Sequence, residues 1–93
     1  MTYRVEFSDS AAKELLALPR AVQMRVRTRI DALAHDPRPA GSAPLTGDLR
    51  GRRKLRVGDY RIVYAVEDDV LVVWVVAVGH RQAVYGEARR RRR

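Results

Sequence analysis

The sequence predicts an α+β domain in the element order β-α-α-β-β-β, in which a helical hairpin packs on a small antiparallel-meander sheet. Three observations carry this prediction: a strand-like alternation at the start, two apolar stripes of helical spacing after it, and three strand-like segments in the second half. The 93 residues are enough for one small domain. We expect residues 1–88 to form it, with room for a short C-terminal helix, and residues 89–93 to form a basic, disordered tail.

The first two elements have clear local signals. Residues 3–7 alternate apolar and polar side chains, as a half-buried strand does. Ser8 follows at an N-cap position, where its hydroxyl can accept a hydrogen bond from the first turn of a helix. Apolar residues then recur at helical spacing as far as Leu18, and Pro19 ends this helix.

A second helix is expected from about residue 20 to residue 35. Its apolar stripe occupies one face, whereas Arg25 and Arg29 lie four residues apart on another. We interpret these two arginines as a solvated surface, with a contact to RNA as the alternative. Residues 36–48 contain three prolines and two glycines without periodicity, so we expect an irregular connection.

Three strands are expected after it, at about residues 49–57, 60–67 and 70–79. Between the first two, Gly58 and Asp59 fit a two-residue hairpin turn whose first position requires a positive φ. Side chains alternate between the two faces of a sheet, so this turn separates charged from apolar residues. The cations that share one face are Arg52, Lys54, Arg56 and Arg61. The apolar residues that share the other face, toward the helices, are Leu55, Val57, Tyr60, Ile62, Tyr64 and Val66.

The side taken by Arg81 depends on the loop at Asp68 and Asp69. A two-residue loop puts Arg81 on the apolar face, whereas a three-residue loop or one bulge reverses the alternation. The odd loop also puts Trp74 on the core side, where the only tryptophan is expected. We therefore expect an odd loop, with Arg81 on the cationic face.

The net charge of the chain favours one class of partner. The 19 Lys and Arg against 11 Asp and Glu give a formal charge of +8, which favours a polyanionic partner such as nucleic acid. Without the five charges of residues 89–93 the charge is only +3, so the position of the cations decides the matter. Four like charges on adjacent strands favour an anion site, although exposed strands also carry cations to resist aggregation. Both interpretations stay open.

Other classes are excluded by what the sequence lacks. No apolar run approaches the roughly 18–20 residues of a membrane span, and the start does not have the pattern of a signal peptide. There is no cysteine, which excludes a disulfide framework and a thiolate zinc site. We expect a cytoplasmic protein with no cofactor, no metal site and no membrane partner.

The chain resembles the RelE branch of the RelE/ParE toxin superfamily in the segments VEFSDSAAKELLALP and LTGDLRGRRKLRVGDYRIVYAVEDDVLVVWVVAVGHR and in the closing VY. The most specific part is LRVGDYRIVY followed by VxVGHR. The resemblance implies a RelE-like fold and a toxin of a type II toxin–antitoxin system. RelE-type toxins are ribosome-dependent, metal-independent endoribonucleases that cleave mRNA in the ribosomal A site through attack by the 2′-hydroxyl. ParE members share the fold but inhibit DNA gyrase.

The resemblance also implies roles for single residues. Arg61 of GDYR matches the family arginine that contacts the scissile phosphate, and Arg81 of VGHR matches the arginine proposed to protonate the leaving oxygen. Tyr85 of the closing VY matches a tyrosine implicated in stacking or orientation. The basic residues with family counterparts on the preceding strand are Arg52, Lys54 and Arg56. Two departures are the arginine at position 52, where the best-known RelE has lysine, and the shorter link from Arg81 to Tyr85.

The residue types favour catalysis by positioned charges. The two histidines, His35 and His80, lie far apart in the sequence, so we do not expect a histidine pair. Neighbouring cations favour the neutral amine of Lys54, which could act as base, while arginines stabilise charge at phosphorus. His80 is either an acid or base or a strand end, and Tyr85 either stacks on a base or packs on the sheet. The candidate site therefore has as catalytic residues Lys54, Arg61, Arg81 and Tyr85, and as RNA- or phosphate-binding residues Arg52, Arg53, Arg56 and His80.

Three functions stay open: a ribosome-dependent mRNA endonuclease that inhibits translation, a ParE-like gyrase inhibitor without nuclease activity, and a noncatalytic RNA-binding module. The expected partners are the ribosome with its mRNA and a cognate RelB-like antitoxin. An acidic or amphipathic segment of that antitoxin would fold on the basic surface and form a toxin–antitoxin hetero-oligomer.

Overall fold

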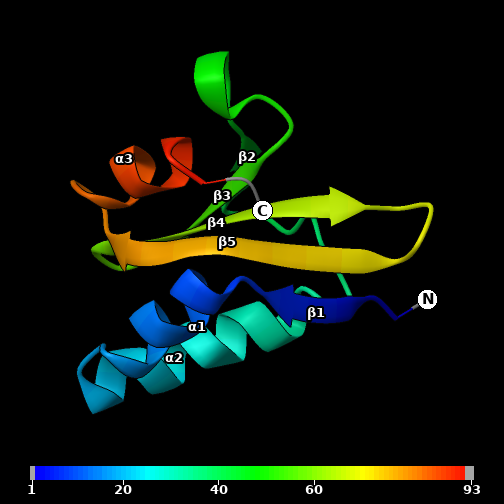
Figure 1. Cartoon of the computed structure of the whole chain (residues 1–93). Helices are drawn as coiled ribbons and strands as arrows, with labels where there is room; N and C mark the ends of the chain where they lie inside the picture. The colour runs from blue at the N-terminus through cyan, green and yellow to red at the C-terminus, as the bar shows by residue number, and fades with distance from the viewer. Residues whose placement is uncertain (1, 92–93) are drawn as a thin grey trace.

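The computed structural model describes residues 2–91, which form one five-stranded sheet with helices on both faces (Figure 1). The elements are β1 (Arg4–Phe7), α1 (Asp9–Leu16), α2 (Arg20–Ala32), β2 (Ser42–Pro44), the 3-10 turn η1 (Gly47–Leu49), β3 (Arg53–Val57), β4 (Tyr60–Glu67), β5 (Val72–His80) and α3 (Val84–Arg89). The strand order is β1-β5-β4-β3-β2, with β1 parallel to β5 and the other neighbours antiparallel. The predicted α+β class, helical hairpin and short C-terminal helix are confirmed.

The helical hairpin forms where its local signals lie. The Ser8 hydroxyl accepts a hydrogen bond from the Ala11 N–H at 3.1 Å, as expected of the N-cap of α1. Pro19 precedes the first turn of α2, where its missing N–H is not needed. In Figure 1 the two helices lie together against one face of the sheet. None of the helices within residues 2–91 has the length and apolar character needed to cross a membrane.

The main hydrophobic core lies between this hairpin and the sheet. Alternation puts Leu55, Ile62 and Tyr64 on the helix side, and each is fully buried. From α2, Val26 and Ile30 meet them at the spacing of one helix turn. Burying an aliphatic or aromatic side chain contributes about 1.5–3 kcal/mol, so this layer supplies much of the stability. The predicted apolar face of the β3–β4 hairpin is confirmed.

Strand β2 lies inside the segment that was expected to be irregular. It pairs with β3, and the buried Tyr64 explains why it is held there. The Tyr64 hydroxyl donates to the Pro37 carbonyl at 2.8 Å and lies 2.7 Å from the Ser42 hydroxyl. Arg53 Nε donates to the same Ser42 oxygen at 2.9 Å. These contacts replace the periodic apolar pattern that β2 lacks.

Replacing Tyr64 by phenylalanine is expected to lower the free energy of unfolding by about 1–2 kcal/mol, since the buried Pro37 carbonyl loses its hydrogen-bond donor. Tyr3→Phe is the matched control, because the Tyr3 hydroxyl donates to the exposed Asp68. Urea denaturation followed by circular dichroism measures both variants. A loss in Tyr64→Phe no larger than that in the control would contradict this account of β2.

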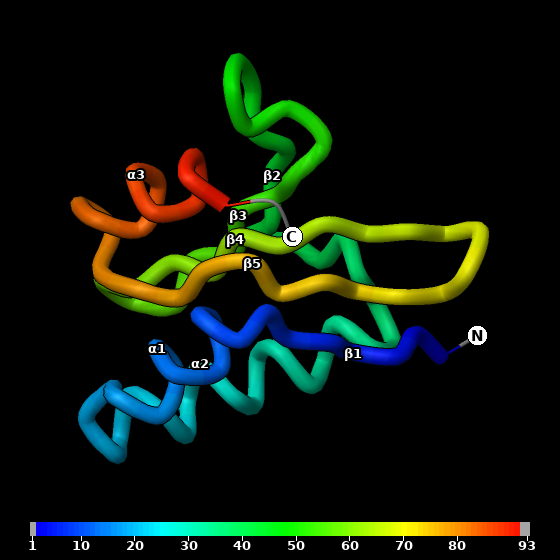
Figure 2. Tube along the Cα trace, viewed as in Figure 1, coloured from blue at the N-terminus to red at the C-terminus, as the bar shows by residue number. Residues whose placement is uncertain are grey.

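Helix α3 lies on the face of the sheet opposite the helical hairpin (Figure 2), and a second, smaller core lies under it. Val84 and Ala88 of α3 pack against the sheet there. The sheet contributes Val63 of β4 and two consecutive residues of β5, Val76 and Ala77. Consecutive residues share a face only where the alternation is interrupted, and a β-bulge between the pairs Val63–Ala77 and Tyr64–Val75 supplies that interruption.

The bulge, and not the loop, reverses the alternation of β5. Glu67 pairs with Val72, so the loop has four residues and preserves the alternation; the predicted odd loop is wrong. Trp74 accordingly lies opposite Ala65, on the face away from the helical hairpin, which corrects its expected place in the core. Past the bulge, Gly79 pairs with Arg61. A long run of valines fits either face of the sheet equally well. Only the packing of β5 under α3 could therefore decide which face each of its residues takes.

The C-terminal segment folds back onto the domain. Arg91 donates two hydrogen bonds to the Glu14 carboxylate, at 2.8 and 2.9 Å, and one to the Val76 carbonyl at 3.1 Å. Its side chain is only 18% exposed. Residues 89–93 were expected to form a disordered tail, whereas in the structure Arg89 ends α3 and Arg91 is bonded to a carboxylate of α1. Residues 92 and 93 lie outside the described part of the chain.

Candidate functional site

The β3–β4 hairpin carries the predicted cationic face. Arg56 pairs with Arg61 across the two strands, around a turn in which Gly58 has a φ of 59°. Lys54 and Arg56 are exposed and alternate with the buried Leu55 and Val57, so they point away from the helical hairpin. The predicted register and turn are confirmed. Like charges placed opposite each other repel, so the arrangement favours a bound anion.

Two of the predicted catalytic arginines meet at the Gly58–Asp59 turn. Arg61 Nη1 donates to the carbonyl oxygens of Gly58 and Tyr60, at 2.8 and 2.9 Å. The backbone N–H of Arg81 donates to the Asp59 carbonyl at 2.9 Å. The bulge puts Gly79 on the face of Arg61, and Arg81 follows two positions later, just past the end of β5. The turn thus gathers both arginines at one end of the sheet.

Tyr85 lies on α3, which covers part of the same face. Its side chain is half-buried and packs against the second core. The packing that was one of its two expected roles is therefore present. The second core under α3 includes Val63, which shares the face of the sheet with Lys54 and Arg61, so a role of Tyr85 in stacking on a base stays a prediction.

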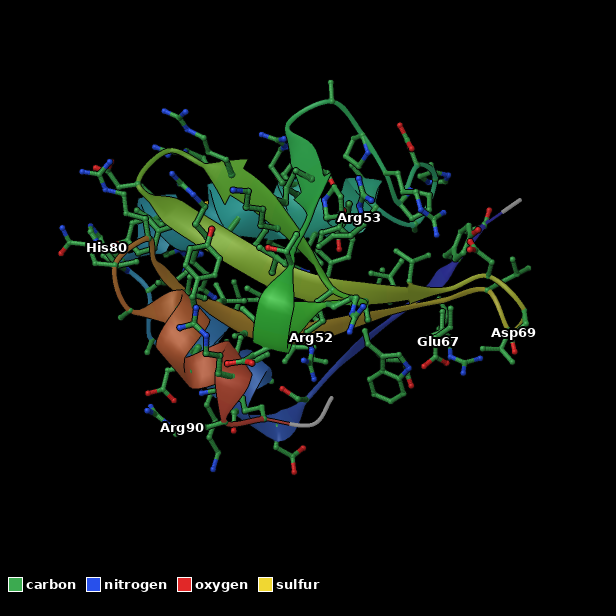
Figure 3. The ribbon with its side chains drawn as sticks, turned by 90° about the horizontal axis from the view of Figure 1, so that it is seen from above. Arg52, Arg53, Glu67, Asp69, His80 and Arg90 are labelled. Carbon is green, nitrogen blue, oxygen red and sulfur yellow. The ribbon has the colours of Figure 1, made fainter. Side chains whose placement is uncertain are left out.

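Arg53 and His80 do not join the cationic face. Arg53 alternates with Lys54 and bonds to Ser42 on the helix side of the sheet. His80 pairs with Tyr60, and their rings make an edge contact with centroids 5.8 Å apart. Figure 3 shows His80 at one end of the sheet and Arg53 away from it. Their roles in phosphate binding stay predictions, and their placement does not favour them.

Arg52 lies between the site and the C-terminal segment. It directly precedes β3, and its side chain is half-buried. Arg52 Nη2 donates to the Arg91 carbonyl at 3.0 Å. The guanidinium therefore already holds the end of the chain, with donors left over for a phosphate because arginine has five N–H groups.

Arg25 of α2 reaches the same turn, which the sequence did not indicate. Its Nη2 lies 2.7 Å from the position that a Cβ on Gly58 would take. Only the packing of α2 across the sheet brings the two residues together, because they are 33 positions apart in the sequence. Periodicity assigns Arg25 to a polar helix face and says nothing about which strand end that face meets.

The opposite end of the sheet is acidic. Glu67 and Asp69 lie there, far from His80 (Figure 3). Asp68 of the same loop accepts hydrogen bonds from both Arg38 and Tyr3, and these bonds hold the pKa of its carboxyl below the ordinary value. No group of three His, Asp or Glu side chains able to hold a metal ion gathers within residues 2–91. The basic end is therefore the part of the sheet suited to an anion.

Clustered cations at one end of the sheet of a small α+β domain are typical of the class of proteins that bind a polyanion. The family described as the ParE toxin of type II toxin-antitoxin system, parDE, matches residues 5–85. The mRNA interferase toxin RelE of Escherichia coli (strain K12) is 34% identical over 98 residues, with 98% of each chain covered. Toxin RelE of Mycobacterium tuberculosis is 34% identical over 84 residues, with 89% of this chain and 86% of the relative covered.

Solved structures agree with these relatives. A variant of the E. coli toxin RelE in the free state has a TM-score of 0.73 at 34% identity, with 95% of both chains covered. The archaeal RelE–RelB complex from Pyrococcus horikoshii OT3 has a TM-score of 0.72 at 32% identity, covering 87% of this chain and 97% of that one. The chain belongs to the RelE/ParE superfamily of type II toxin–antitoxin toxins.

Proposed function

We propose that this toxin is a ribosome-dependent endoribonuclease that cleaves mRNA in the A site and acts in the cytoplasm, where ribosomes meet mRNA. The observation that carries the proposal is the Gly58–Asp59 turn, which gathers Arg61 and Arg81 beside Lys54 and Arg56. Such a cluster suits a reaction in which negative charge develops on a phosphate. Relatives named mRNA interferase support the same conclusion.

The reaction forms one phosphorus–oxygen bond and breaks another. The 2′-oxygen of one nucleotide attacks the adjacent phosphorus, and its proton passes to a base, for which Lys54 is the candidate. The bond from phosphorus to the 5′-oxygen of the next nucleotide breaks, and Arg81 supplies the proton that this oxygen takes. Arg61 stabilises the charge on the phosphoryl oxygens. The products are a 2′,3′-cyclic phosphate and a 5′-hydroxyl. Solvent then takes the extra proton from Lys54 and returns one to Arg81.

The remaining residues bind and orient the strand. Arg52 and Arg56 lie two positions before and after Lys54, where they suit neighbouring phosphates. Tyr85 would hold a base next to the cleaved bond. A positioned acid or base contributes about 10²–10⁴-fold, and alignment of the attacking oxygen contributes further. Because Lys54, Arg56 and Arg81 are exposed on an open surface, the A site is needed to align the RNA. Free RNA should therefore be a poor substrate.

The cognate antitoxin is the second partner. Solved relatives include complexes of RelE with RelB from P. horikoshii and from E. coli. For this chain we infer a RelB-like antitoxin with an acidic or amphipathic segment that covers the basic end of the sheet. Neutralising Arg56, Arg61 and Arg81 would keep the toxin inactive in the hetero-oligomer, since opposite potentials fix such partners in register.

Inhibition of DNA gyrase is the second candidate function, because the matching family is described by the ParE toxin. Primer extension on a defined mRNA, with and without programmed ribosomes, separates the two. The proposed nuclease produces A-site cuts that need the ribosome. Growth arrest without such cuts would favour gyrase inhibition. Efficient cutting of naked RNA at low protein concentration would show that cleavage does not depend on the ribosome. A noncatalytic RNA-binding module would bind RNA but would produce neither cuts in the primer-extension assay nor growth arrest.

A further inference from the structure

Arg25 approaches the Gly58–Asp59 turn from α2, whereas Arg61 approaches it from the cationic face of the sheet. Its Nη2 lies 2.7 Å from the place of a Gly58 Cβ, so glycine leaves room for the guanidinium as well as adopting the positive φ. Arg61 Nη1 is bonded to the carbonyl oxygen of the same glycine. Both contacts are made to Gly58. Only the atoms of this glycine separate them, so Arg25 Nη2 and Arg61 Nη1 lie within about 9 Å of each other.

The neighbourhood of Arg25 is positively charged. Arg56, Arg61 and Arg81 surround the same turn, and Asp59 is the acidic residue within it. Among residues 2–91, no carboxylate forms an ion pair with Arg25, whereas Arg27 two positions later pairs with Asp31 at 3.3 Å. The guanidinium groups of Arg25 and Arg61 both contact Gly58, and two like charges this close are unfavourable unless an anion joins them. Arginine is also the side chain best suited to bind a phosphate with two parallel hydrogen bonds.

We propose that Arg25 binds a phosphodiester of the substrate strand next to the scissile phosphate, and so extends the site from the sheet to α2. This inference rests on the proposed function. Arg25 holds the strand across the turn while Arg61 acts on the reacting phosphate. It is a substrate-binding and positioning residue, so it acts on the affinity for RNA more than on the chemical step.

The test replaces Arg25 by methionine, which removes the charge and keeps an apolar stem for packing. Arg27→Met is the matched control, since it removes the same charge from the same helix. On programmed ribosomes, Arg25→Met should raise KM about tenfold and leave kcat within about twofold, as loss of uniform binding does. Arg27→Met should leave both constants unchanged. Equal thermal midpoints of unfolding in the two variants show that the fold is kept.

Binding to a single-stranded RNA oligonucleotide with 2′-deoxyribose at every position that could be attacked gives a readout without cleavage. The slope of log affinity against log salt should fall by about 0.7 for Arg25→Met, the value for one phosphate contact on a single strand. An unchanged slope and KM would overturn the inference. Weaker binding to empty ribosomes with an unchanged RNA slope would also overturn it, because the contact would then belong to ribosomal RNA.

The proposed function can fail separately. If Arg61→Ala leaves cleavage intact, or if the wild-type chain makes no cuts, the nuclease assignment fails whatever Arg25 does. If Arg61→Ala abolishes cleavage while Arg25→Met matches Arg27→Met in every assay, the nuclease stands and the role of Arg25 is wrong.

Discussion

Replacing Arg61 by alanine is expected to lower kcat for mRNA cleavage on programmed ribosomes by about 10²–10³-fold, the loss typical of removing one charge-stabilising donor. The carbonyl oxygens of Gly58 and Tyr60 hold its guanidinium in place before substrate binds. The interaction therefore gains strength as charge develops on the phosphate, without reorganisation at that moment. Single-turnover primer extension at saturating toxin measures the chemical step directly.

Arg4→Ala is the control for this experiment. Arg4 lies on the edge strand β1, is 70% exposed and is paired with Glu6, so its loss removes the same charge far from the site. Its cleavage rate should equal that of the wild-type chain. Both variants should keep the wild-type circular dichroism and bind the antitoxin. A rate for Arg61→Ala within a few-fold of Arg4→Ala would mean that the cationic face binds and does not catalyse.

Replacing Glu14 by alanine is expected to lower the free energy of unfolding by about 2–3 kcal/mol. Glu14 accepts two hydrogen bonds from Arg91 and a third, at 3.1 Å, from the backbone N–H of Val78. Strand β1 pairs with β5 only as far as Val75, so this carboxylate accepts from a part of β5 that has no strand on that edge. Its loss leaves a poorly solvated N–H and an arginine that is 18% exposed without their main acceptor.

Chemical denaturation measures the loss, and hydrogen exchange of the α3 amides shows where it arises. Asp31→Ala is the matched control, because the Asp31–Arg27 pair lies on the surface with both side chains at least 60% exposed. Such pairs contribute about 0–1 kcal/mol. Faster exchange in α3 is expected for Glu14→Ala alone. Equal losses in the two variants would show that Arg91 does not fasten the C-terminal segment.

The features that depend on contacts between residues close in the sequence could be predicted from the sequence. Ser8 caps α1 because its hydroxyl reaches an N–H three residues on, and Gly58 forms the hairpin turn because it tolerates a positive φ. The register that puts Lys54 and Arg61 on one face follows from that turn alone. Arg61 and Arg81 could also be named from the motifs GDYR and VGHR, and their roles stay to be tested.

The features that could not be predicted depend on contacts between distant segments. Strand β2 exists because Ser42 meets Tyr64 and Arg53, although its own residues favour an irregular connection. The parity of β5 depends on a bulge at Val76, in a run of valines that fits either face. Trp74 precedes the bulge, so the four-residue loop alone sets its side, and the expected odd loop placed it wrongly.

The sequence by itself determined the helical hairpin, the β3–β4 turn and the separation of cations from the core, because each follows from periods of 2 or 3.6 residues and from one glycine. Only the tertiary structure decided that Arg91 returns to Glu14, that Arg25 reaches Gly58, and that His80 faces away from the site. Side-chain direction at these positions depends on which elements pack together, and packing is a property of the whole chain.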